Sequence, residues 1–365
     1  MSQIVYFSKM FQAVPHLAQV ATQLPGTFIS SRHSTLQAAK HLYPDLAIAN
    51  YSRWLGPFSA GKRLLKKADV IVTGSPYRSF LQPYQARKCT VFHGTYMLLS
   101  KHALLANAHF DLLCVTGPRM EQMIRRFRPE IELNTVTTGF LPFCEFPVPT
   151  PEHRQQTLNM LGLDPELQTI VYTPSRRGFG SWNLLAEQLV RTTPTAFNLV
   201  LRPHPSQSLT SRRADRASFR KITELAKTRP NTLVDLTSLA LSSLQSVADL
   251  LISDANSPAE ESLFYDVPQL FIETPLFNAD VVKKMAEKEQ MHPEDTARLL
   301  TLFECGHRHY IDTPPSDLSR LIEHAIQDAP SHAKQRESYF SWVFGTRDRY
   351  AHQRVAQAIQ THLLT

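Results

Sequence analysis

The chain has 365 residues, of which 42% are hydrophobic and 19% are charged, and its formal net charge is +7. This length is too great for one typical core, so it predicts two domains of about 150–200 residues each. The composition excludes a disordered chain. No stretch reaches the roughly 18 apolar residues of a membrane-spanning helix, and the N-terminus has no signal-peptide pattern. The sequence therefore predicts a cytoplasmic protein.

The four cysteines, Cys89, Cys114, Cys144 and Cys305, show no paired spacing. This pattern is typical of a reducing compartment. Cys305, His307 and His309 are metal ligands by residue type, but no second pair has the spacing of a zinc site. We expect no metal and no other cofactor.

The positive charge is concentrated in the first part of the chain. Residues 1–150 carry 16 Lys or Arg and 7 Asp or Glu, and residues 53–88 contain eight basic residues and one acid. Such a region attracts anionic lipid head groups, polyanionic polymers or nucleic acid, although a solvated helix face is an equally good interpretation of residues 61–69. A surface that binds single-stranded nucleic acid needs aromatic residues between the basic ones, on which the bases stack. This region lacks that pattern, so we expect no nucleic-acid partner. An anionic membrane face remains the expected contact of this region.

Strand-like runs alternate with helical stretches along the chain. The runs of the first half are IVYF (4–7), ADVIVTG (68–74), KCTVFHG (88–94), FDLLCVTG (110–117) and ELNTVTTG (132–139). Four of these five end in glycine, which lets a ligand approach the backbone at the end of a strand. The runs of the second half are TIVYTPS (169–175), NLVLRPHP (198–205), NTLVDL (231–236) and the segment around 250.

A proline-rich segment separates the two series. Residues 142–153 contain four prolines and have neither a helical nor a strand period, so they are the best candidate for a linker. We predict an α/β protein of two doubly wound Rossmann-type domains joined by this linker. The expected domains are 1–145 and 155–330. Residues 331–365 form a C-terminal helix that packs across both, and its spacing of Val355, Ile359 and Leu363 is amphipathic.

Residues 248–272 read as a buried strand, a charged turn, a capped helix and a second buried strand. Ser257 is the expected N-cap, Pro258 fits the first helical position, and Glu260 completes a capping box. The backbone N–H groups at such a helix start favour an anion at the carboxyl edge of the sheet. Asp254, Asn256 and Ser257 are therefore candidate donor- or phosphate-binding residues, although a purely structural helix has the same signals.

Two histidines follow strands in different halves of the chain, His93 in TVFHGTY and His204 in VLRPHPS. If the two sheets face one another, both imidazoles reach a shared cleft, as a general base or as donors to phosphate. Gly94 and Thr95 are expected to open a helix and offer backbone N–H groups. Arg176 and Arg177, directly after the strand TIVY, are candidates to bind pyrophosphate. The alternative interpretation is that they lie in a solvated turn.

These segments, taken in order, resemble the CDP-glycerol glycerophosphotransferase family over about residues 85–360. The resemblance rests on His93-Gly94-Thr95, Thr173-Pro174-Ser175-Arg176, Arg202-Pro203-His204-Pro205, Ser253-Asp254 with Ser257, and the late segment with Gly345 and Arg354. Members of that family are GT-B transferases that build teichoic-acid-like or capsular polyol-phosphate polymers.

The resemblance implies a GT-B-like arrangement in which the two domains face an interdomain cleft, with residues 1–145 on the acceptor and membrane side and residues 155–330 binding a nucleotide donor. It further implies a peripheral membrane transferase that moves a polyol phosphate from a CDP-activated donor to a hydroxyl of an anionic glycan or lipid-linked acceptor, with CMP leaving. His93 would be the base, and His204, Arg176, Asn256 and Ser257 would hold the pyrophosphate.

The chain departs from the family after Asp254, where Ala255-Asn256-Ser257 replaces the usual Tyr-Ser-Ser and is followed by Glu260 and Glu261. Glu261 resembles the ribose-binding glutamate of nucleotide-sugar GT-B enzymes and of UDP-sugar 2-epimerases, but the paired glycines of the epimerases are missing. A GT-B glycosyltransferase that uses a nucleotide sugar, and a non-catalytic GT-B-like scaffold, therefore stand as alternatives.

Overall fold

The computed structural model describes residues 2–128, 130–209 and 212–364. The chain divides into two compact units. Unit 1 comprises Met1–Glu145, Glu289–His292 and Ser341–Thr365, and unit 2 comprises Phe146–Lys288 and Pro293–Phe340. The division after Glu145 lies inside the proline-rich segment, and residues 141–145 of that segment form a 3₁₀ turn. The second division lies inside a long helix, α16 (Ala333–Phe344).

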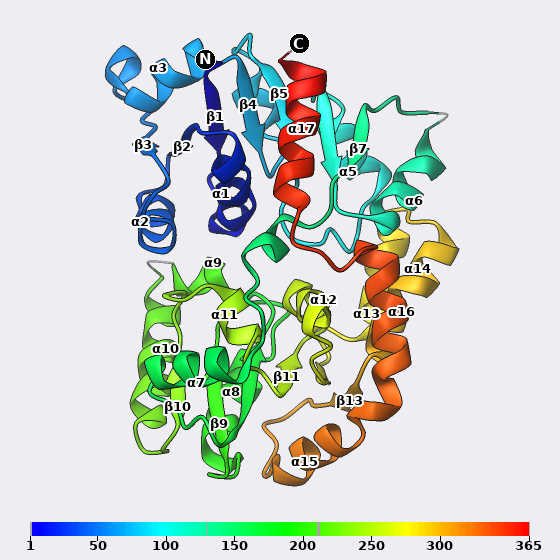
Figure 1. The fold of residues 1–365 in the computed structure, drawn as a ribbon. Helices are drawn as coiled ribbons and strands as arrows, with labels where there is room; N and C mark the ends of the chain where they lie inside the picture. Colours follow the sequence, from blue (N-terminus) through cyan, green and yellow to red (C-terminus); the bar gives the residue numbers. More distant parts are fainter. Residues whose placement is uncertain (1, 129, 210–211, 365) are drawn as a thin grey trace. The chain divides into compact units, whose positions relative to one another are not determined.

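The described residues of unit 1 form a seven-stranded parallel sheet in the order β3-β2-β1-β4-β5-β6-β7 (Figure 1). Its strands are β1 (Ile4–Phe7), β2 (Thr27–Ser30), β3 (Ile48–Asn50), β4 (Val70–Thr73), β5 (Arg87–Thr90), β6 (Leu112–Val115) and β7 (Thr135–Thr137). Its helices are α1 (Val14–Gln23), α2 (His33–Leu42), α3 (Ala60–Lys67), α4 (Arg78–Leu81), α5 (Lys101–Asn107), α6 (Pro118–Phe127) and α17 (Ala351–Leu363).

The described residues of unit 2 form a six-stranded parallel sheet in the order β10-β9-β8-β11-β12-β13. Its strands are β8 (Gln168–Thr173), β9 (Phe197–Leu201), β10 (Thr232–Val234), β11 (Leu250–Ser253), β12 (Gln269–Glu273) and β13 (His307–Tyr310). Its helices are α7 (Pro151–Met160), α8 (Trp182–Thr192), α9 (Pro205–Ser208), α10 (Arg213–Ala226), α11 (Leu241–Gln245), α12 (Ser257–Ser262), α13 (Ala279–Lys288), α14 (Pro293–Leu300) and α15 (Ser319–Gln327).

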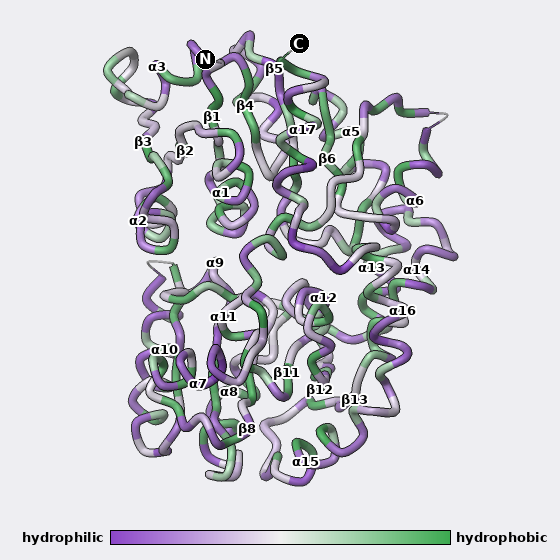
Figure 2. Tube along the Cα trace, in the orientation of Figure 1, coloured by the Kyte–Doolittle hydropathy of each residue, from purple (hydrophilic) through white to green (hydrophobic). Residues whose placement is uncertain are grey.

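The central strands of both sheets are apolar because helices cover them on both faces. Leu250, Leu251 and Ile252 of β11 are at most 1% exposed, as their continuous apolar run predicts. Figure 2 shows the same strands as hydrophobic segments inside each unit. In both sheets the strand order reverses next to the first strand of the unit, beside β1 and beside β8. Ligands of doubly wound sheets bind outside the carboxyl ends of the strands at this point.

Apart from β1, which has the bounds of its predicted run, the strands are shorter than the runs that predicted them. β5 ends at Thr90, so His93 lies in a loop three residues beyond the strand. Cys305 ends a 3₁₀ turn, and His307 and His309 lie in the edge strand β13 that follows, where their side chains share a face. No group of ligating residues that could hold a metal occurs among the described residues.

The last helix of the chain, α17, has the predicted amphipathic pattern. Val355 and Ile359 are fully buried, and the helix packs on α1 and β6 of unit 1. Arg354 donates from Nε to the carbonyl oxygen of Thr138 at 2.6 Å and pairs with Asp348, which anchors the start of the helix to the end of β7.

All four cysteines are free, although the sulfurs of Cys89 and Cys114 lie 3.8 Å apart on neighbouring strands. None of the helices in the described part of the chain has the length and hydropathy to cross a membrane.

Candidate functional site

The loop after β5 in unit 1 holds His93 in one defined orientation. Nδ1 of His93 lies 2.5 Å from the carbonyl oxygen of Gly74, at the end of β4, and 3.1 Å from the Ser75 hydroxyl. Because a carbonyl oxygen only accepts, the hydrogen bond to Gly74 places the imidazole proton on Nδ1. Nε2 then keeps its lone pair, and it has no hydrogen-bond partner among the described residues. Burial lowers the pKa of His93, so the ring is neutral at pH 7 and Nε2 can accept a proton.

Residues 91–100 form an irregular loop, so the expected helix at Gly94 and Thr95 is wrong. The helix begins at Lys101, with Ser100 as its N-cap. Gly94 has φ = +64°, and its N–H donates to Nε2 of His16 at 3.1 Å. The carbonyl oxygen of Thr95 accepts from the buried Arg119 guanidinium at 2.5 Å. Both residues are thus used inside unit 1 to shape the loop that carries His93, and the N–H of Gly94 is already occupied.

In unit 2 the loop between β8 and α8 (residues 174–181) is closed around Asp254 at the end of β11. One carboxylate oxygen of Asp254 accepts from the backbone N–H groups of Ser175 at 2.6 Å and Ser181 at 3.0 Å. The other accepts from the Ser181 hydroxyl, which in turn accepts from the Tyr172 hydroxyl at 2.7 Å. Asp254 is 1% exposed, and both of its carboxylate oxygens accept hydrogen bonds from the loop, so its side chain holds the loop 174–181 in place. This is the structural role of the residue that the sequence indicated as a candidate for donor or phosphate binding.

Burial raises the pKa of Asp254 to about 6, against the opposing effect of these hydrogen bonds. The folded state therefore holds this proton more tightly than the unfolded state, whose aspartate pKa is about 3.9. We expect the free energy of unfolding to fall by up to about 3 kcal/mol from this group as pH rises from about 4 to about 6.

Asp254→Asn should remove that pH dependence, because asparagine can keep the same acceptor toward both N–H groups while carrying no charge. Urea denaturation at pH 4 and pH 7 measures it, and Asp45→Asn, at an exposed position, is the matched control. Equal pH dependence in wild type and Asp254→Asn would contradict the assignment.

The two arginines of this loop behave differently. Arg177 pairs with Asp215 of α10, whose side chain is 7% exposed, and its backbone N–H donates to the Gln207 amide oxygen at 2.7 Å. Arg176 is exposed, lies 5.2 Å from the Phe179 ring and has no carboxylate partner among the described residues. Arg176 is thus the cation that a phosphate can reach, whereas Arg177 holds the loop against α10.

His204 follows β9 and is the N-cap of the short helix α9. Its Nδ1 accepts from the backbone N–H of Ser206 at 3.1 Å and lies 2.8 Å from the Ser206 hydroxyl. Because Nδ1 is the acceptor, the proton of the neutral ring lies on Nε2, which is the reverse of His93. Burial, with a smaller contribution from Arg176, lowers the pKa of His204 to about 4. At pH 7 this histidine is a neutral hydrogen-bond donor at Nε2.

The helix after β11 begins one residue earlier than predicted. Asn256, and not Ser257, is the N-cap of α12, and Pro258 lies at the second helical position. Ala255 has φ = +49°, a tight turn that leaves Asn256 extended, so its amide oxygen can reach the N–H of Ala259 at 3.4 Å. The amide nitrogen of Asn256 donates to the carbonyl oxygen of Thr173 at 2.7 Å. The Asn256 side chain is thereby committed to joining β8 and α12.

The two glutamates of α12 have different surroundings. Glu260 is fully buried and accepts from the Tyr339 hydroxyl of α16 at 2.7 Å. Glu261 is partly exposed, as is Ser257 at the first turn. Ser257, Pro258 and Glu261 are the partly exposed residues of this helix.

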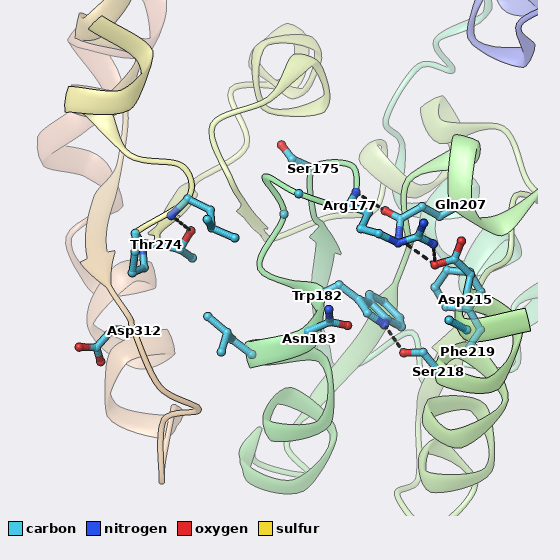
Figure 3. Close-up of a pocket in the computed structure, with 16 residues that line it drawn as sticks. Ser175, Arg177, Trp182, Asn183, Gln207, Asp215, Ser218, Phe219, Thr274 and Asp312 are labelled. Carbon is cyan, nitrogen blue, oxygen red and sulfur yellow. Dashed lines mark hydrogen bonds and ion pairs between the residues drawn. The ribbon is translucent and has the colours of Figure 1, made fainter. Parts of the chain in front are cut away.

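A cavity of about 400 Å³ lies in unit 2 next to the loop 174–181 (Figure 3). The loop, α8, α10 and residues 274–276 after β12 line it. One wall is aromatic, with Trp182 and Phe219, and the Trp182 indole N–H donates to the Ser218 hydroxyl at 3.0 Å. On the same side of the cavity lie the Arg177–Asp215 pair and Gln207, and Thr274 and Asp312 lie across from them (Figure 3). The sequence did not indicate these wall residues, because Gln207, Asp215 and Phe219 lie in helices and carry no motif.

No protein-family model matches the chain, and no curated protein sequence matches it. Its structure, however, is similar to several solved structures over the whole chain. The wall teichoic acid polymerase TagF, in a variant soaked with CDPG, is 14% identical with a TM-score of 0.65, covering 100% of this chain and 89% of that chain. MnaA of S. aureus in complex with UDP is 14% identical with a TM-score of 0.62, covering 100% of this chain and 97% of that chain.

The UDP-GlcNAc 2-epimerase of Neisseria meningitidis, bound to UDP-GlcNAc, is 12% identical with a TM-score of 0.57, covering 99% of this chain and 100% of that chain. These similarities, with the two doubly wound parallel sheets, decide the fold class. The chain has a GT-B-like fold. The α/β class of two Rossmann-type domains that the sequence predicted is confirmed, and it is the fold that the family resemblance implied.

Proposed function

We propose that this protein is a transferase that moves a polyol phosphate from a CDP-activated donor to a hydroxyl group of a cell-envelope acceptor. The observation that carries the proposal is the opposite proton placement on two histidines. His93 offers a lone pair at Nε2, and His204 offers an N–H at Nε2. An acid–base reaction on phosphate needs one proton acceptor and one hydrogen-bond donor. Both histidines are neutral at pH 7, so each has the form that its role requires.

In the proposed reaction the acceptor hydroxyl oxygen forms a bond to the phosphorus of the polyol phosphate. Its proton passes to Nε2 of His93. The bond between that phosphorus and the bridging oxygen of the diphosphate breaks, and CMP leaves with the electron pair. Nε2–H of His204 and the exposed guanidinium of Arg176 stabilise the charge on the leaving phosphate, as proteins do in phosphoryl transfer.

The donor is placed by the ends of β8, β9 and β11. Asp254 and Asn256 hold the loop 174–181 and the start of α12 in register, and Ser257 and Glu261 are the candidates for contact with phosphate and ribose hydroxyls. The exposure of Glu261 on α12 supports this role, while Glu260 is committed to Tyr339. TagF, whose structure shares this fold, was studied with CDPG, which supports a CDP-linked donor.

We further propose that the acceptor is an anionic or lipid-linked glycan and that the protein works at the inner face of the cell membrane, where the basic region 53–88 attracts anionic surfaces. Capsule and teichoic-acid-like polymers are the acceptor classes that combine hydroxyl groups with phosphate or carboxylate charge. Electrostatic attraction of the acceptor would raise its local concentration at unit 1.

A nucleotide sugar is the second candidate donor. Glu261 and the absence of a Tyr-Ser pair after Asp254 favour it, and MnaA and the 2-epimerase of the same fold were solved with UDP and UDP-GlcNAc. In that case the acceptor oxygen attacks the anomeric carbon and a nucleoside diphosphate leaves. His93 would keep its role as base, and His204 would bind the departing diphosphate.

Calorimetric titration with CDP-glycerol, CDP-ribitol, a CMP-sugar and UDP-sugars tests the proposal. We expect selective binding of a CDP-polyol and at least a tenfold weaker affinity in His204→Ala, because one hydrogen bond to a charged group is lost. Selective binding of a UDP- or CMP-sugar would replace the phosphotransferase by the glycosyltransferase. Absence of binding and turnover with every donor, together with binding of an anionic polymer, would favour a non-catalytic scaffold.

A further inference from the structure

The segment before α3 exposes large apolar side chains that no part of unit 1 covers. Trp54 is 95% exposed, Phe58 is 84% exposed and Leu55 is 55% exposed. All three lie within five residues, in the loop and 3₁₀ turn that join β3 to α3. We call residues 53–67 the α3 surface. Figure 1 draws α3 beside β3, the edge strand of the unit 1 sheet.

The loop is held in shape by polar groups rather than by a core of its own. Ser59 is 2% exposed, and its hydroxyl accepts from the backbone N–H of Ser52 at 2.9 Å and of Lys62 at 3.4 Å. The backbone N–H of Phe58 donates to the carbonyl oxygen of Leu55 at 2.9 Å. Gly61 lets α3 approach closely, since a Cβ there would lie 2.9 Å from the carbonyl oxygen of Asn50. Trp54 and Phe58 are thus presented outward by a closed, ordered loop.

The same surface carries a strong positive charge. It contains five basic residues and no acidic residue, namely Arg53, Lys62, Arg63, Lys66 and Lys67. None of the five has an ion-pair partner among the described residues. Arg53, Arg63, Lys66 and Lys67 are exposed, while Leu65 on the opposite side of α3 is 1% exposed and packs into the unit. The helix therefore buries one face and turns cations to solvent with the other.

We propose that the α3 surface binds an anionic lipid bilayer, with Trp54 and Phe58 inserted at the interface and the cations in contact with the head groups. Aromatic rings flanked by Lys and Arg are the side-chain combination that the interface favours, because it takes up apolar and cationic groups together. A second copy of this chain is disfavoured as the occupant, since two α3 surfaces would bring unpaired cations face to face. This inference rests on the membrane contact proposed above for residues 53–88, which it assigns to particular side chains, and it does not depend on the donor or on the reaction.

Tryptophan fluorescence tests the insertion directly. The chain has three tryptophans, of which Trp182 is 6% and Trp342 is 3% exposed, so a change in environment on lipid binding reports Trp54. Titration with vesicles of 70% phosphatidylcholine and 30% phosphatidylglycerol should shift the emission to the blue and protect it from acrylamide. Pure phosphatidylcholine vesicles should do neither. Binding without any blue shift would overturn the insertion of Trp54.

Vesicle sedimentation of variants separates the two contributions. Lys66→Gln/Lys67→Gln should weaken binding to the anionic vesicles by about tenfold or more, and Phe58→Ser by a similar factor. Lys283→Gln/Lys284→Gln and Met160→Ser, which change exposed residues of unit 2, are matched controls and should bind as wild type does. Equal binding by all variants, or preference for a single-stranded oligonucleotide over the vesicles, would overturn the proposal.

The experiment uses neither donor nor acceptor, so its result is distinct from that of the proposed function. Turnover with a water-soluble acceptor should be unchanged in Phe58→Ser, because this residue lies outside the groups assigned to chemistry. Vesicle binding with no donor binding would retain the α3 surface and reject the transferase. Donor binding without vesicle binding would do the opposite.

Discussion

His93→Ala is expected to lower the rate of transfer by about 10²–10⁴-fold, the usual contribution of a general base, while the affinity for the donor stays within about twofold. The reason is the position of the imidazole proton. Gly74 holds it on Nδ1, so Nε2 is the atom that accepts the proton of the acceptor hydroxyl. Alanine removes that acceptor and leaves unit 2, with the groups assigned to the donor, unchanged.

Steady-state kinetics and calorimetry of the same protein preparation measure the two quantities. His33→Ala is the matched control, because His33 is exposed at the start of α2 and has no role in the proposal. A rate within threefold of wild type in His93→Ala would remove His93 from the mechanism. A rate that falls together with donor affinity would assign it to binding instead.

The rate of transfer should also depend on pH, with a loss on the acidic side only. Burial lowers the pKa of His93, so the base is already deprotonated at neutral pH, and the rate should fall only at acidic pH as the ring takes up a proton. His16, buried beside it with a pKa lowered to about 3, stays neutral throughout and keeps its Nε2 on the N–H of Gly94.

Donor affinity is expected to depend strongly on His204. His204→Ala should weaken binding of the donor by about 10–100-fold, because a hydrogen bond to a charged phosphate is lost and Arg176 remains as the one exposed cation of the described loop 174–181. His204→Gln should recover most of this loss. The amide nitrogen of glutamine can stand near Nε2 of histidine and donate the same hydrogen bond.

The pH dependence of donor binding separates this neutral role from a cationic one. With a pKa of about 4, His204 carries no charge between pH 6.5 and pH 8, so affinity should be flat over that range. A tenfold gain in affinity as pH falls from 8 to 6.5, present in wild type and absent in His204→Gln, would show that the ring binds as a cation. Equal affinity of His204→Ala and wild type would exclude any contact with the donor.

The sequence predicted the strands well because their signal is local. A parallel strand buried on both faces must be apolar at every position, so runs such as residues 250–252 identify it without any knowledge of the rest of the chain. The edge strands β3 and β13 lack this signal. β3 is half-exposed, and β13 alternates His307 and His309 with exposed residues, which made ligating residue types look like a metal motif.

The candidate site was only partly visible in the sequence. Residue type and position after a strand identified His93, His204 and Arg176. The same rule also selected Asp254 and Arg177, whose side chains the structure commits to Ser175, Ser181 and Asp215. A carboxylate after a strand can face a ligand or close a loop, and the sequence is the same in both cases. The exposed Trp54 and Phe58 were missed because exposure depends on what packs nearby.

The sequence by itself determined the two series of alternating strands and helices, the amphipathic last helix and the concentration of positive charge in residues 53–88, since each depends on residues close together in the chain. Ser206, two residues along the chain, sets the proton of His204 locally, but only the tertiary structure decided which ring nitrogen of His93 carries the proton and which of two adjacent arginines has no carboxylate partner among the described residues. Hydrogen-bond partners such as Gly74 and Asp215 decide these properties, and they lie on other elements that only folding brings within 3 Å of His93 and Arg177.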